Sequence, residues 1–494
     1  MKPDQGDHLA RDARLTESHS PSMAEVAFAA ELTSYSPLWP WLSIADLAHV
    51  RSLVDAGVIE ADTGRTLLSG LVALHHEPMP VLDPELGDLY NNREVLVRDR
   101  LGEIADQIHT GRARREATTV AWHLETRLRI EEAVESLSRL VQTLADVSEK
   151  FADAAMSDFT YLQHAHPTTL GHYLLTFAYP LSRDIDRMGE ALHRVNRSPA
   201  GSGSVNGSRL PIDRAALARD LEFDGLIVHN RDAMWAPDIA LEPVAVAMSA
   251  LITIDRLAEE LQIWASSEFG YFVPADRHSR TSVIMPQKKN PYGLAMIRGH
   301  AREALGIVVS VATTNLTPSG QPDNRVAAYG KVPAILRTVS GTATLLAEHI
   351  EFGQFDTARM DAASRVGFTS STEICDWMTL EHGVTNRTAH RLVGRAVRAA
   401  IERGAEQLTL EDLEYAADDL GIELPSISGE ELASLQDPAT IIRERKSPGS
   451  VGDMDQMIES LRTTLRKVPP ARFGDFEARF VARVEAEANE RTSS

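Results

Sequence analysis

The sequence predicts an all-α protein, in which a central bundle of long helices is flanked by a smaller helical domain at each end. Residues 117–150 contain neither Gly nor Pro, and apolar residues such as Leu124, Leu128 and Leu137 recur at spacings of mostly three and four. That spacing is the period of one helix face. Strand-like alternation is nearly absent from the chain. Together these observations favour a long-helix bundle.

Further segments have the length and apolar pattern of bundle helices: residues 168–196, 239–268, 292–314 and 331–351. Residues 239–268 are apolar on nearly every side, which is typical of a helix buried at the centre of a bundle. Helices with so little polar face suggest that several chains share one core. We therefore expect a homo-oligomer.

The chain changes character after about residue 355, where it becomes more polar and its predicted helices are shorter, such as 385–403 and 409–420. We expect an N-terminal helical domain (1–115), a central bundle (116–355) and a C-terminal helical domain (356–494). Two segments interrupt the bundle helices, at 198–212 and 270–291. Loops of this length inside a compact core are uncommon and are usually functional.

Composition excludes several classes of function. The 494 residues are 43% hydrophobic and 24% charged, as in globular proteins. The net charge of −21 argues against non-specific nucleic-acid binding, because no basic face exists to release counterions. Cys375 is the only cysteine, so no intramolecular disulfide and no cysteine-type zinc site can form, which fits a reducing cytoplasmic setting. The N-terminus lacks the apolar core of a signal peptide, and the most apolar run, Pro243 to Asp255, is too short to span a bilayer.

The second interruption ends in TSVIMPQKKNP, which combines chemically useful groups. It offers the hydroxyl of Ser282, the cation of Lys288, the amide of Asn290, and Pro291, which can start the next helix at its first position. A helix N-terminus has spare N–H groups and positive potential, so the stretch suits an anion such as a carboxylate whose charge grows during reaction. Lysine is rare in this chain, so the pair Lys288-Lys289 needs an explanation. The alternative is a solvated loop pair without function.

This stretch resembles the signature loop of the fumarase/aspartase superfamily, which reads roughly GSSxMPxKxNP. The form MPQKKNP is typical of the argininosuccinate lyase branch. Other matches follow in the same order along the chain: HTGRARRE resembles the branch's first conserved region, FTYLQHAHPTTLGHYLL its second, and GSGSVNGSRLPIDR a glycine-rich stretch. The similarity covers about residues 85–455.

The resemblance implies a homotetramer with a twenty-helix core, in which each active site combines regions of three subunits. It implies anti β-elimination to fumarate without a cofactor, with Ser282 as the base. Lys288, Asn290 and Thr160 would hold the dianion that forms on the substrate carboxylate. A serine hydroxyl becomes basic only where such donors are preorganised in a closed, dry site. Further positions in matched motifs are candidates for substrate binding: Arg114, Gln163, Met285 and Gln321.

The first region departs from the branch pattern. It reads Ala113-Arg114-Arg115-Glu116 where the argininosuccinate lyases have Ser-Arg-Asn-Asp. The arginine persists as Arg114, whereas the hydroxyl and the amide are absent. Arg115 could bind a second substrate carboxylate, or it could be a surface residue paired with Glu116.

The second region departs as well, because Tyr161 replaces a histidine that the family uses in acid–base chemistry. His164 and His166 stand nearby as candidate proton donors, although packing is the alternative for both. Without accompanying carboxylates or cysteines, this histidine pair does not predict a metal site.

Other departures lie in the signature loop and in a later segment. Thr281 replaces the signature glycine and Val283 replaces the second serine. Residues 316–325 keep Gln321 and Asp323 but have Leu316 and Asn324 where the family has tyrosine and lysine. For His172, Asn206 and Trp235, also in matched regions, packing is the better interpretation.

These changes cluster where the family grips the amine half of its substrate, whereas the fumarate half is better kept. We therefore expect a carbon–nitrogen lyase that splits an N-substituted aspartate into fumarate and an amine or amino acid, in either direction. It resembles lyases that act on other N-substituted aspartates, including aminocarboxylic acids. The alternatives are authentic argininosuccinate lyase, a lactone-forming cycloisomerase of the same superfamily, and an inactive structural paralogue.

Overall fold

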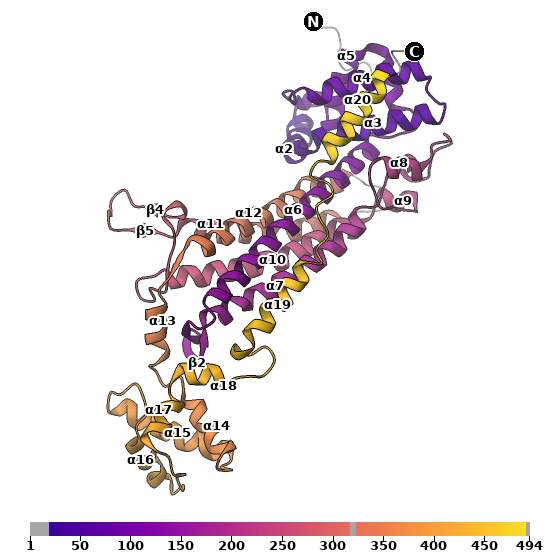
Figure 1. Cartoon of the computed structure of the whole chain (residues 1–494). Helices are drawn as coiled ribbons and strands as arrows, with labels where there is room; N and C mark the ends of the chain where they lie inside the picture. The colour runs from indigo at the N-terminus through magenta and orange to yellow at the C-terminus, as the bar shows by residue number, and fades with distance from the viewer. Residues whose placement is uncertain (1–18, 317–322, 491–494) are drawn as a thin grey trace.

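Long helices packed lengthwise form the body of the molecule (Figure 1). The computed structural model describes residues 19–316 and 323–490. The bundle helices are α6 (Arg114–Lys150), α7 (Leu170–Val195), α10 (Pro237–Trp264), α11 (Tyr292–Thr314) and α12 (Asp323–Phe352). Helix α6 packs against α7 and α12, and α10 packs against α7, α11 and α12. The expectation of an all-α protein with a central long-helix bundle is confirmed.

The observed helix bounds lie within three residues of the predicted ones, except at the end of α10, which is Trp264 and not residue 268, and at the start of α12. Helix α11 covers the predicted range, whereas α12 begins at Asp323 and not at residue 331. Gly330 and Pro333 disfavour helix locally, but burial of Tyr329 and Val332 against the bundle outweighs that preference. Gly330 is also needed for packing, because a Cβ there would lie 2.2 Å from the carbonyl oxygen of Ser34.

Helix α10 differs from the expectation that it is buried all round. One face packs on its neighbours, but the other is partly uncovered, and Ile252 is 43% exposed. Its length and its mean hydropathy of 1.5 over the most apolar stretch would allow it to cross a membrane, yet half of that stretch is buried inside the chain. Core helices of bundles have the same composition, so the finding is weak evidence for a membrane.

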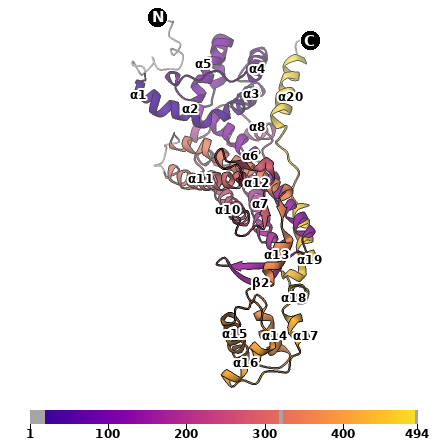
Figure 2. The same cartoon turned by 90° about the vertical axis from the view of Figure 1, so that its left-hand side faces the viewer.

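One end of the bundle is covered by N-terminal helices (Figures 1 and 2). These are α2 (Ala30–Tyr35), α3 (Trp39–Asp55), α4 (Ala61–His76) and α5 (Leu89–Leu101). The last helix of the chain, α20 (Phe476–Glu490), returns to this end and packs on α3 and α4. Trp41 and Phe476 stack there with ring centroids 6.5 Å apart. Short helices nearby are α1 (Pro21–Met23), α8 (Arg214–Asp220) and α9 (Asn230–Ala233).

The opposite end carries a separate helical unit (Figures 1 and 2). Helices α14 (Ser371–Leu380), α15 (Asn386–Glu402), α16 (Leu410–Leu420) and α17 (Gly429–Leu435) surround an apolar cluster of their own. Helices α13 (Thr357–Ser364) and α18 (Pro438–Glu444) connect this unit to the bundle. Helix α19 (Met454–Leu465) runs back along α6 and α7.

The strands in the described part of the chain are short and lie in two-stranded antiparallel pairs. Strand β1 (Ala155–Thr160) pairs with β2 (Gln163–Thr169), and β3 (Phe272–Val273) pairs with β6 (Gln354–Phe355). Strand β4 (Arg280–Thr281) pairs with β5 (Lys289–Asn290). The first and third pairs are hairpins that carry matched motifs. These strands therefore belong to the candidate site and not to the hydrophobic core.

Candidate active site

The signature loop, residues 270–291, ends in the β4–β5 hairpin, which projects from the side of the bundle (Figure 1). Ser282 directly follows β4. Its Oγ accepts hydrogen bonds from the backbone N–H groups of Ile284 (3.3 Å) and Met285 (3.1 Å). These local bonds fix the turn and stabilise negative charge on the oxygen, as a serine that acts as a base requires.

Lysines 288 and 289 have different environments although they are neighbours. Lys289 forms an ion pair with Asp276, with Nζ and Oδ1 2.7 Å apart, and so joins β5 to the short turn that precedes β4. Lys288 is exposed, and the structure shows no ion pair for it among the described residues. Lys288 is therefore the cation of this pair that is available to a ligand, and its role in binding stays a prediction.

Asn290 closes the hairpin, because its side-chain amide donates to the carbonyl oxygen of Arg280 over 3.0 Å. One N–H of the amide remains for a ligand. Pro291 occupies the N-cap of α11, with φ −74° and ψ 63°, and the helix begins at Tyr292. The prediction that this proline is the first helical residue is therefore wrong by one position, because its ψ lies outside the helical range.

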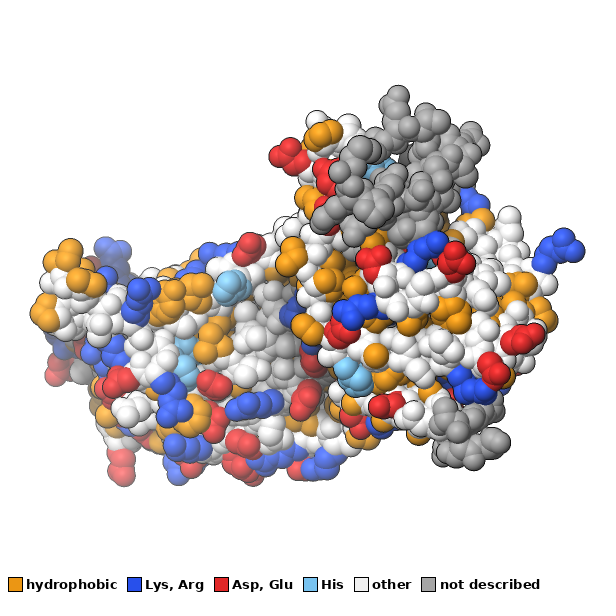
Figure 3. Space-filling model, turned by 90° about the horizontal axis from the view of Figure 1, so that it is seen from above, with side chains coloured by type: hydrophobic (Ala, Val, Ile, Leu, Met, Phe, Trp, Pro, Cys, Tyr) orange, Lys and Arg blue, Asp and Glu red, His pale blue; other side chains and the backbone are white. Residues whose placement is uncertain are grey.

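The tip of the signature loop is apolar and uncovered. Val283 is fully exposed, Ile284 is 87% exposed and Met285 is 43% exposed. Seen from above, hydrophobic side chains gather at the left end of the molecule, where this hairpin projects (Figure 3). In a single chain these side chains gain nothing from burial, which indicates that they are covered in another state of the protein.

The second matched region forms the β1–β2 hairpin, in which Thr160 and Gln163 flank a two-residue turn. The turn residues Tyr161 and Leu162 have φ of 55° and 59°, in the left-handed region. Glycine or asparagine normally occupies such positions, and a bulky residue costs roughly 1–2 kcal/mol there. Tyr161 is 99% exposed. Strain of this kind is typically kept at functional positions.

His164 and His166 lie on β2 and face the C-terminal unit. The Nε2 of His166 is 3.3 Å from the hydroxyl of Thr372, and the ring of His164 contacts Phe159 with centroids 5.3 Å apart. His172 bonds through its two ring nitrogens to the hydroxyl of Thr168 and the carbonyl oxygen of Gly449, and a structural role for it stays a prediction. The two candidate donors are reachable from solvent, and their catalytic role remains a prediction.

The first matched region is built into the N-terminal end of α6. Arg114 is the first residue of this helix; its guanidinium donates to the side chain of Asn91 and lies 3.6 Å from Asp88. Its side chain is 47% exposed. Arg114 can therefore still reach a carboxylate, but part of its charge is already engaged.

Glu116 is a functional position that the sequence did not single out. It is 1% exposed, and its carboxylate accepts backbone N–H groups from Gly201 (2.7 Å) and Gly203 (2.8 Å). Burial raises the pKa of Glu116, against the lowering effect of Arg112 and the two backbone donors. The signal in the sequence was an acidic residue in the first turn of a predicted helix, with a glycine-rich stretch further along the chain. Glu116 holds the glycine-rich loop and does not face a substrate.

Buried charges fix the rest of this region. Asp46 accepts hydrogen bonds from Arg93 (2.6 Å), Arg112 (2.5 Å) and Tyr90 (2.7 Å). Burial alone would raise the pKa of Asp46, but the two guanidinium groups lower it to about 2. Arg112, two residues before Arg114, is thus held in a buried network of charged groups.

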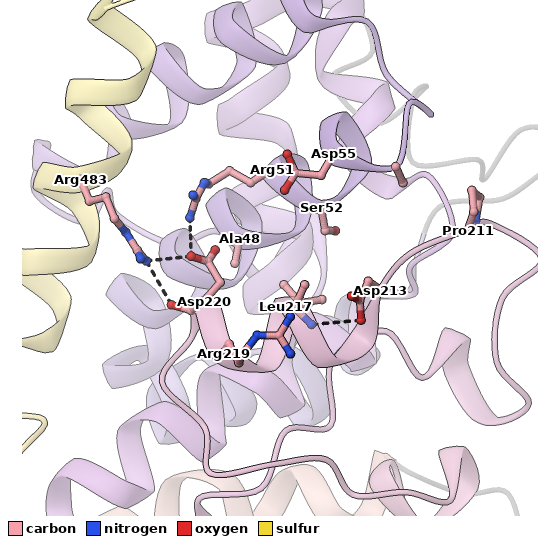
Figure 4. Close-up of a pocket in the computed structure, with 12 residues that line it drawn as sticks. Ala48, Arg51, Ser52, Asp55, Pro211, Asp213, Leu217, Arg219, Asp220 and Arg483 are labelled. Carbon is pink, nitrogen blue, oxygen red and sulfur yellow. Dashed lines mark hydrogen bonds and ion pairs between the residues drawn. The ribbon is translucent and has the colours of Figure 1, made fainter.

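A cavity of about 370 Å³ lies near this end, between α3, α8 and α20 (Figure 4). Several of its charged groups are paired: Arg51 and Arg483 both reach Asp220, at 2.5 and 2.8 Å. Asp213 caps α8 through the N–H groups of Ala215 and Ala216. None of the predicted site residues lines this cavity, so we do not assign the active site to it.

The three matched regions lie apart within one chain (Figure 1). The β4–β5 hairpin projects from the side of the bundle, the β1–β2 hairpin lies near α18, and Arg114 begins α6 at the N-terminal end. Ser282, Lys288 and Asn290 share one hairpin, and Thr160 shares another with Gln163. Gln321 lies outside the described residues, as does the side chain of Asp323. No three His, Cys, Asp or Glu side chains in the described ranges gather as a metal site would require.

Comparisons with known proteins identify a family and relatives with similar sequences. A lyase family model matches residues 77–306, and a model of the argininosuccinate lyase C-terminal region matches residues 368–443. Argininosuccinate lyase of Halorhodospira halophila is 35% identical over 383 residues, which cover 76% of this chain and 82% of that protein. Argininosuccinate lyase of Methanosarcina acetivorans is 32% identical over 414 residues, which cover 82% of this chain and 80% of that protein.

Solved structures show the same fold at lower identity. A crystal structure of EDDS lyase in complex with formate superimposes with a TM-score of 0.79 at 24% identity, covering 97% of this chain and 95% of that one. The 3-carboxy-cis,cis-muconate lactonizing enzyme from Pseudomonas putida gives 0.70 at 19% identity, covering 91% and 100%. Taken with the signature loop and the two other motifs, these similarities show that the chain belongs to the argininosuccinate lyase branch of the fumarase/aspartase superfamily and is an enzyme of its carbon–nitrogen lyase class.

Proposed function

We propose that this enzyme splits an N-substituted L-aspartate into fumarate and an amine other than arginine, or joins the two in reverse. The observation that carries the proposal is the contrast within the site. The hydroxyl, ammonium and amide of Ser282, Lys288 and Asn290 are retained on one hairpin, whereas the first region has lost the hydroxyl and amide of the branch pattern. The fumarate half of the substrate keeps its partners and the amine half does not.

The proposed reaction begins with removal of a proton from Cβ of the aspartate by the Oγ of Ser282. The electron pair moves into the neighbouring carboxylate, which becomes a dianion. Lys288, Asn290 and the hydroxyl of Thr160 stabilise that dianion through charge and hydrogen bonds. The Cα–N bond then breaks, the Cα–Cβ double bond of fumarate forms, and the amine takes a proton. His166 and His164 are the candidate donors of that proton.

Separation of the three regions in one chain supports a shared site. We infer a homotetramer in which the exposed tip around Val283 and Ile284 closes over residues of neighbouring subunits, and in which the uncovered face of α10 is buried. Closure would exclude water, which a serine base needs. The single cysteine is in keeping with a cytoplasmic enzyme. The reaction as proposed requires no cofactor.

A second candidate is authentic argininosuccinate lyase, because that is the name of the relatives that share 35% and 32% identity. The substitutions at Ala113, Arg115 and Tyr161 argue against it. The structure adds that Glu116 is buried and bonded to the glycine-rich loop, so its carboxylate is engaged within the chain.

The test is a substrate panel. The purified protein would be incubated with fumarate and a range of amines and amino acids while the fumarate absorbance is followed, and separately with argininosuccinate in the cleavage direction. We expect addition of an amine to fumarate and slow or no cleavage of argininosuccinate. Turnover of argininosuccinate at ordinary enzyme rates would reject the proposed substrate class.

Matched variants identify the base. Ser282→Ala should lower the rate by about 10²–10⁴-fold, the usual contribution of a general base. Ser279→Ala removes another hydroxyl of the same loop, which bonds to the carbonyl oxygen of Ala275, and should change the rate little. Near-normal turnover by the Ser282 variant would show that the base is misassigned.

A further inference from the structure

The signature loop carries three of the proposed catalytic groups. Its first residues are held by the pairing of β3 with β6, but past this pairing the loop is joined to the body of the protein at few points. The hairpin's own bonds, such as Asn290 to Arg280, connect the loop only to itself. The ion pair of Lys289 and Asp276 is also internal, and because Asp276 is 95% exposed, water screens it and it contributes little. A cavity of about 470 Å³ lies between the loop base and the end of α12. The direction of the hairpin must therefore be set elsewhere.

His278 is the last residue before Ser282 whose side chain is both buried and bonded to the bundle. It is 7% exposed, and its Nε2 lies 3.1 Å from Oε2 of Glu348 on α12. Its ring also contacts the ring of His349 on the same helix, with centroids 4.5 Å apart. A hydrogen bond from a buried ring to a carboxylate is stronger than an exposed ion pair.

The surroundings of His278 leave it little freedom. His349 is fully buried against Gly293 at the start of α11, where a Cβ would lie 2.2 Å from its Nε2. Burial, and then the neighbouring His278, lower the pKa of His349 to about 4, so it stays neutral. Among the described residues neither Nδ1 of His278 nor either nitrogen of His349 has a hydrogen-bond partner. Past the β3–β6 pairing, the hydrogen-bonded connection between the described residues of the loop and α12 therefore rests on the bond from Nε2 of His278 to Glu348.

We propose that His278 is a positioning residue, which sets the direction of the catalytic hairpin through its hydrogen bond to Glu348. The role rests on the proposed function, in which Ser282 is the base. Only three residues separate His278 from Ser282, so a shift of the histidine ring is passed directly to the serine. Displacement of a catalytic group by about 1 Å can cost about 10²-fold in rate.

The test compares two amides of different reach. His278→Gln places its amide nitrogen where Nε2 of the histidine stood, whereas His278→Asn reaches only to the position of Nδ1 and cannot contact Glu348. We expect the Gln variant to stay within a few-fold of wild type. The Asn variant should lose about 10²-fold in kcat, with a smaller change in KM. Glu348→Ala breaks the same bond from a residue that is 35% exposed, and should match the Asn variant.

Hydrogen exchange of the backbone amides in residues 279–291 measures how firmly His278 holds the loop, and it does not depend on enzyme activity. It would be measured with and without fumarate, which is the probe ligand. The Asn and Ala variants should exchange faster than wild type in this segment, and the Gln variant should not. His349→Asn, in the same cluster but not bonded to Glu348, should lower the melting temperature and leave the exchange of the loop unchanged.

Equal exchange and equal activity for the Gln and Asn variants would overturn the proposal, as would loop exchange in Glu348→Ala that matches wild type. A wild-type protein that acts on no N-substituted aspartate would refute the proposed function instead, and the exchange comparison would still decide whether His278 anchors the loop.

Discussion

The first matched region and the signature loop are both expected to contribute to the active site, but they are built in opposite ways. Around Asp46, Arg112 and Glu116, charges are buried and bonded to one another and to backbone groups. Around Ser282 and Lys288 the side chains are exposed, and past the β3–β6 pairing one buried side chain, that of His278, ties the loop to the bundle. One part of the site is prebuilt by the single chain, whereas we propose that the other is completed by substrate and by neighbouring subunits. Lids over active sites are commonly drawn from such weakly held segments.

The comparison predicts that variants of the first region lose stability. Asp46→Ala would leave Arg93 and Arg112 buried without their carboxylate, which should cost about 3–5 kcal/mol in free energy of unfolding. Denaturant unfolding followed by circular dichroism measures the change. The rate per folded molecule should change little, although the free energy of unfolding falls. Wild-type stability in this variant would show that the charge network does not hold the first region.

Variants of the signature loop should instead lose activity. Lys288→Ala removes a cation that stabilises the dianion and should lower kcat by about 10²–10³-fold without changing the melting temperature. Lys289→Ala is the matched control, because it removes the neighbouring cation, whose partner is Asp276 and not the substrate. Its effect should stay within a few-fold. A reversed order would mean that the two lysines have been assigned the wrong roles.

Lowering the pH should destabilise the first region, whose Thr110 is bonded to His49, before it affects the signature loop. Burial, and then the charge of Arg112, lower the pKa of His49 to about 3, whereas the unfolded chain has about 6.5. Below pH 6.5 the unfolded state therefore takes up a proton that the folded state refuses, and stability falls as the pH drops. The loss should be about 2 kcal/mol between pH 6.5 and 5. His49→Gln keeps a donor for the carbonyl oxygen of Thr110 and should flatten this part of the profile. If the stability of His49→Gln depended on pH as that of wild type does, His49 would not be the group that causes the loss.

The smallest effect concerns the strained turn at Tyr161 and Leu162. Leu162→Gly relieves one left-handed residue, which should raise the free energy of unfolding by about 1 kcal/mol. If the turn is kept in this shape for the site, the more stable variant should be less active. Thermal melting and the rate assay, run on the same preparation, separate the two effects. A variant that is both more stable and fully active would mean that the strain has no catalytic purpose.

The sequence predicted the helical parts well because their periodicity is local. Residues 292–314 were predicted as a helix and form α11 with the same bounds, and the long apolar stripe from residue 117 forms most of α6. The start of α12 was missed because Gly330 and Pro333 disfavour helix, and only contact with the rest of the fold outweighs them. Helix α10 was expected to be buried on all sides, but the face around Ile252 is uncovered in one chain.

The site was predictable to the extent that short motifs carry it. The motif placed Ser282, Lys288 and Asn290 on one segment, and the structure puts them on one hairpin. The roles of Glu116 and His278 could not be predicted, because each depends on a partner that is distant in sequence, Gly201 in one case and Glu348 in the other. Arg114 was recognised, but its engagement with Asn91 required the fold.

The central claim is that Ser282 of one subunit and Arg114 of another serve the same active site. Mixing two inactive variants, Ser282→Ala and Arg114→Ala, after reversible dissociation tests it most directly. If the site is shared, about one quarter of the sites in a random mixed assembly receive both intact residues, and activity returns to about that fraction. Mixed assemblies that form but remain as inactive as the separate variants would contradict the shared site.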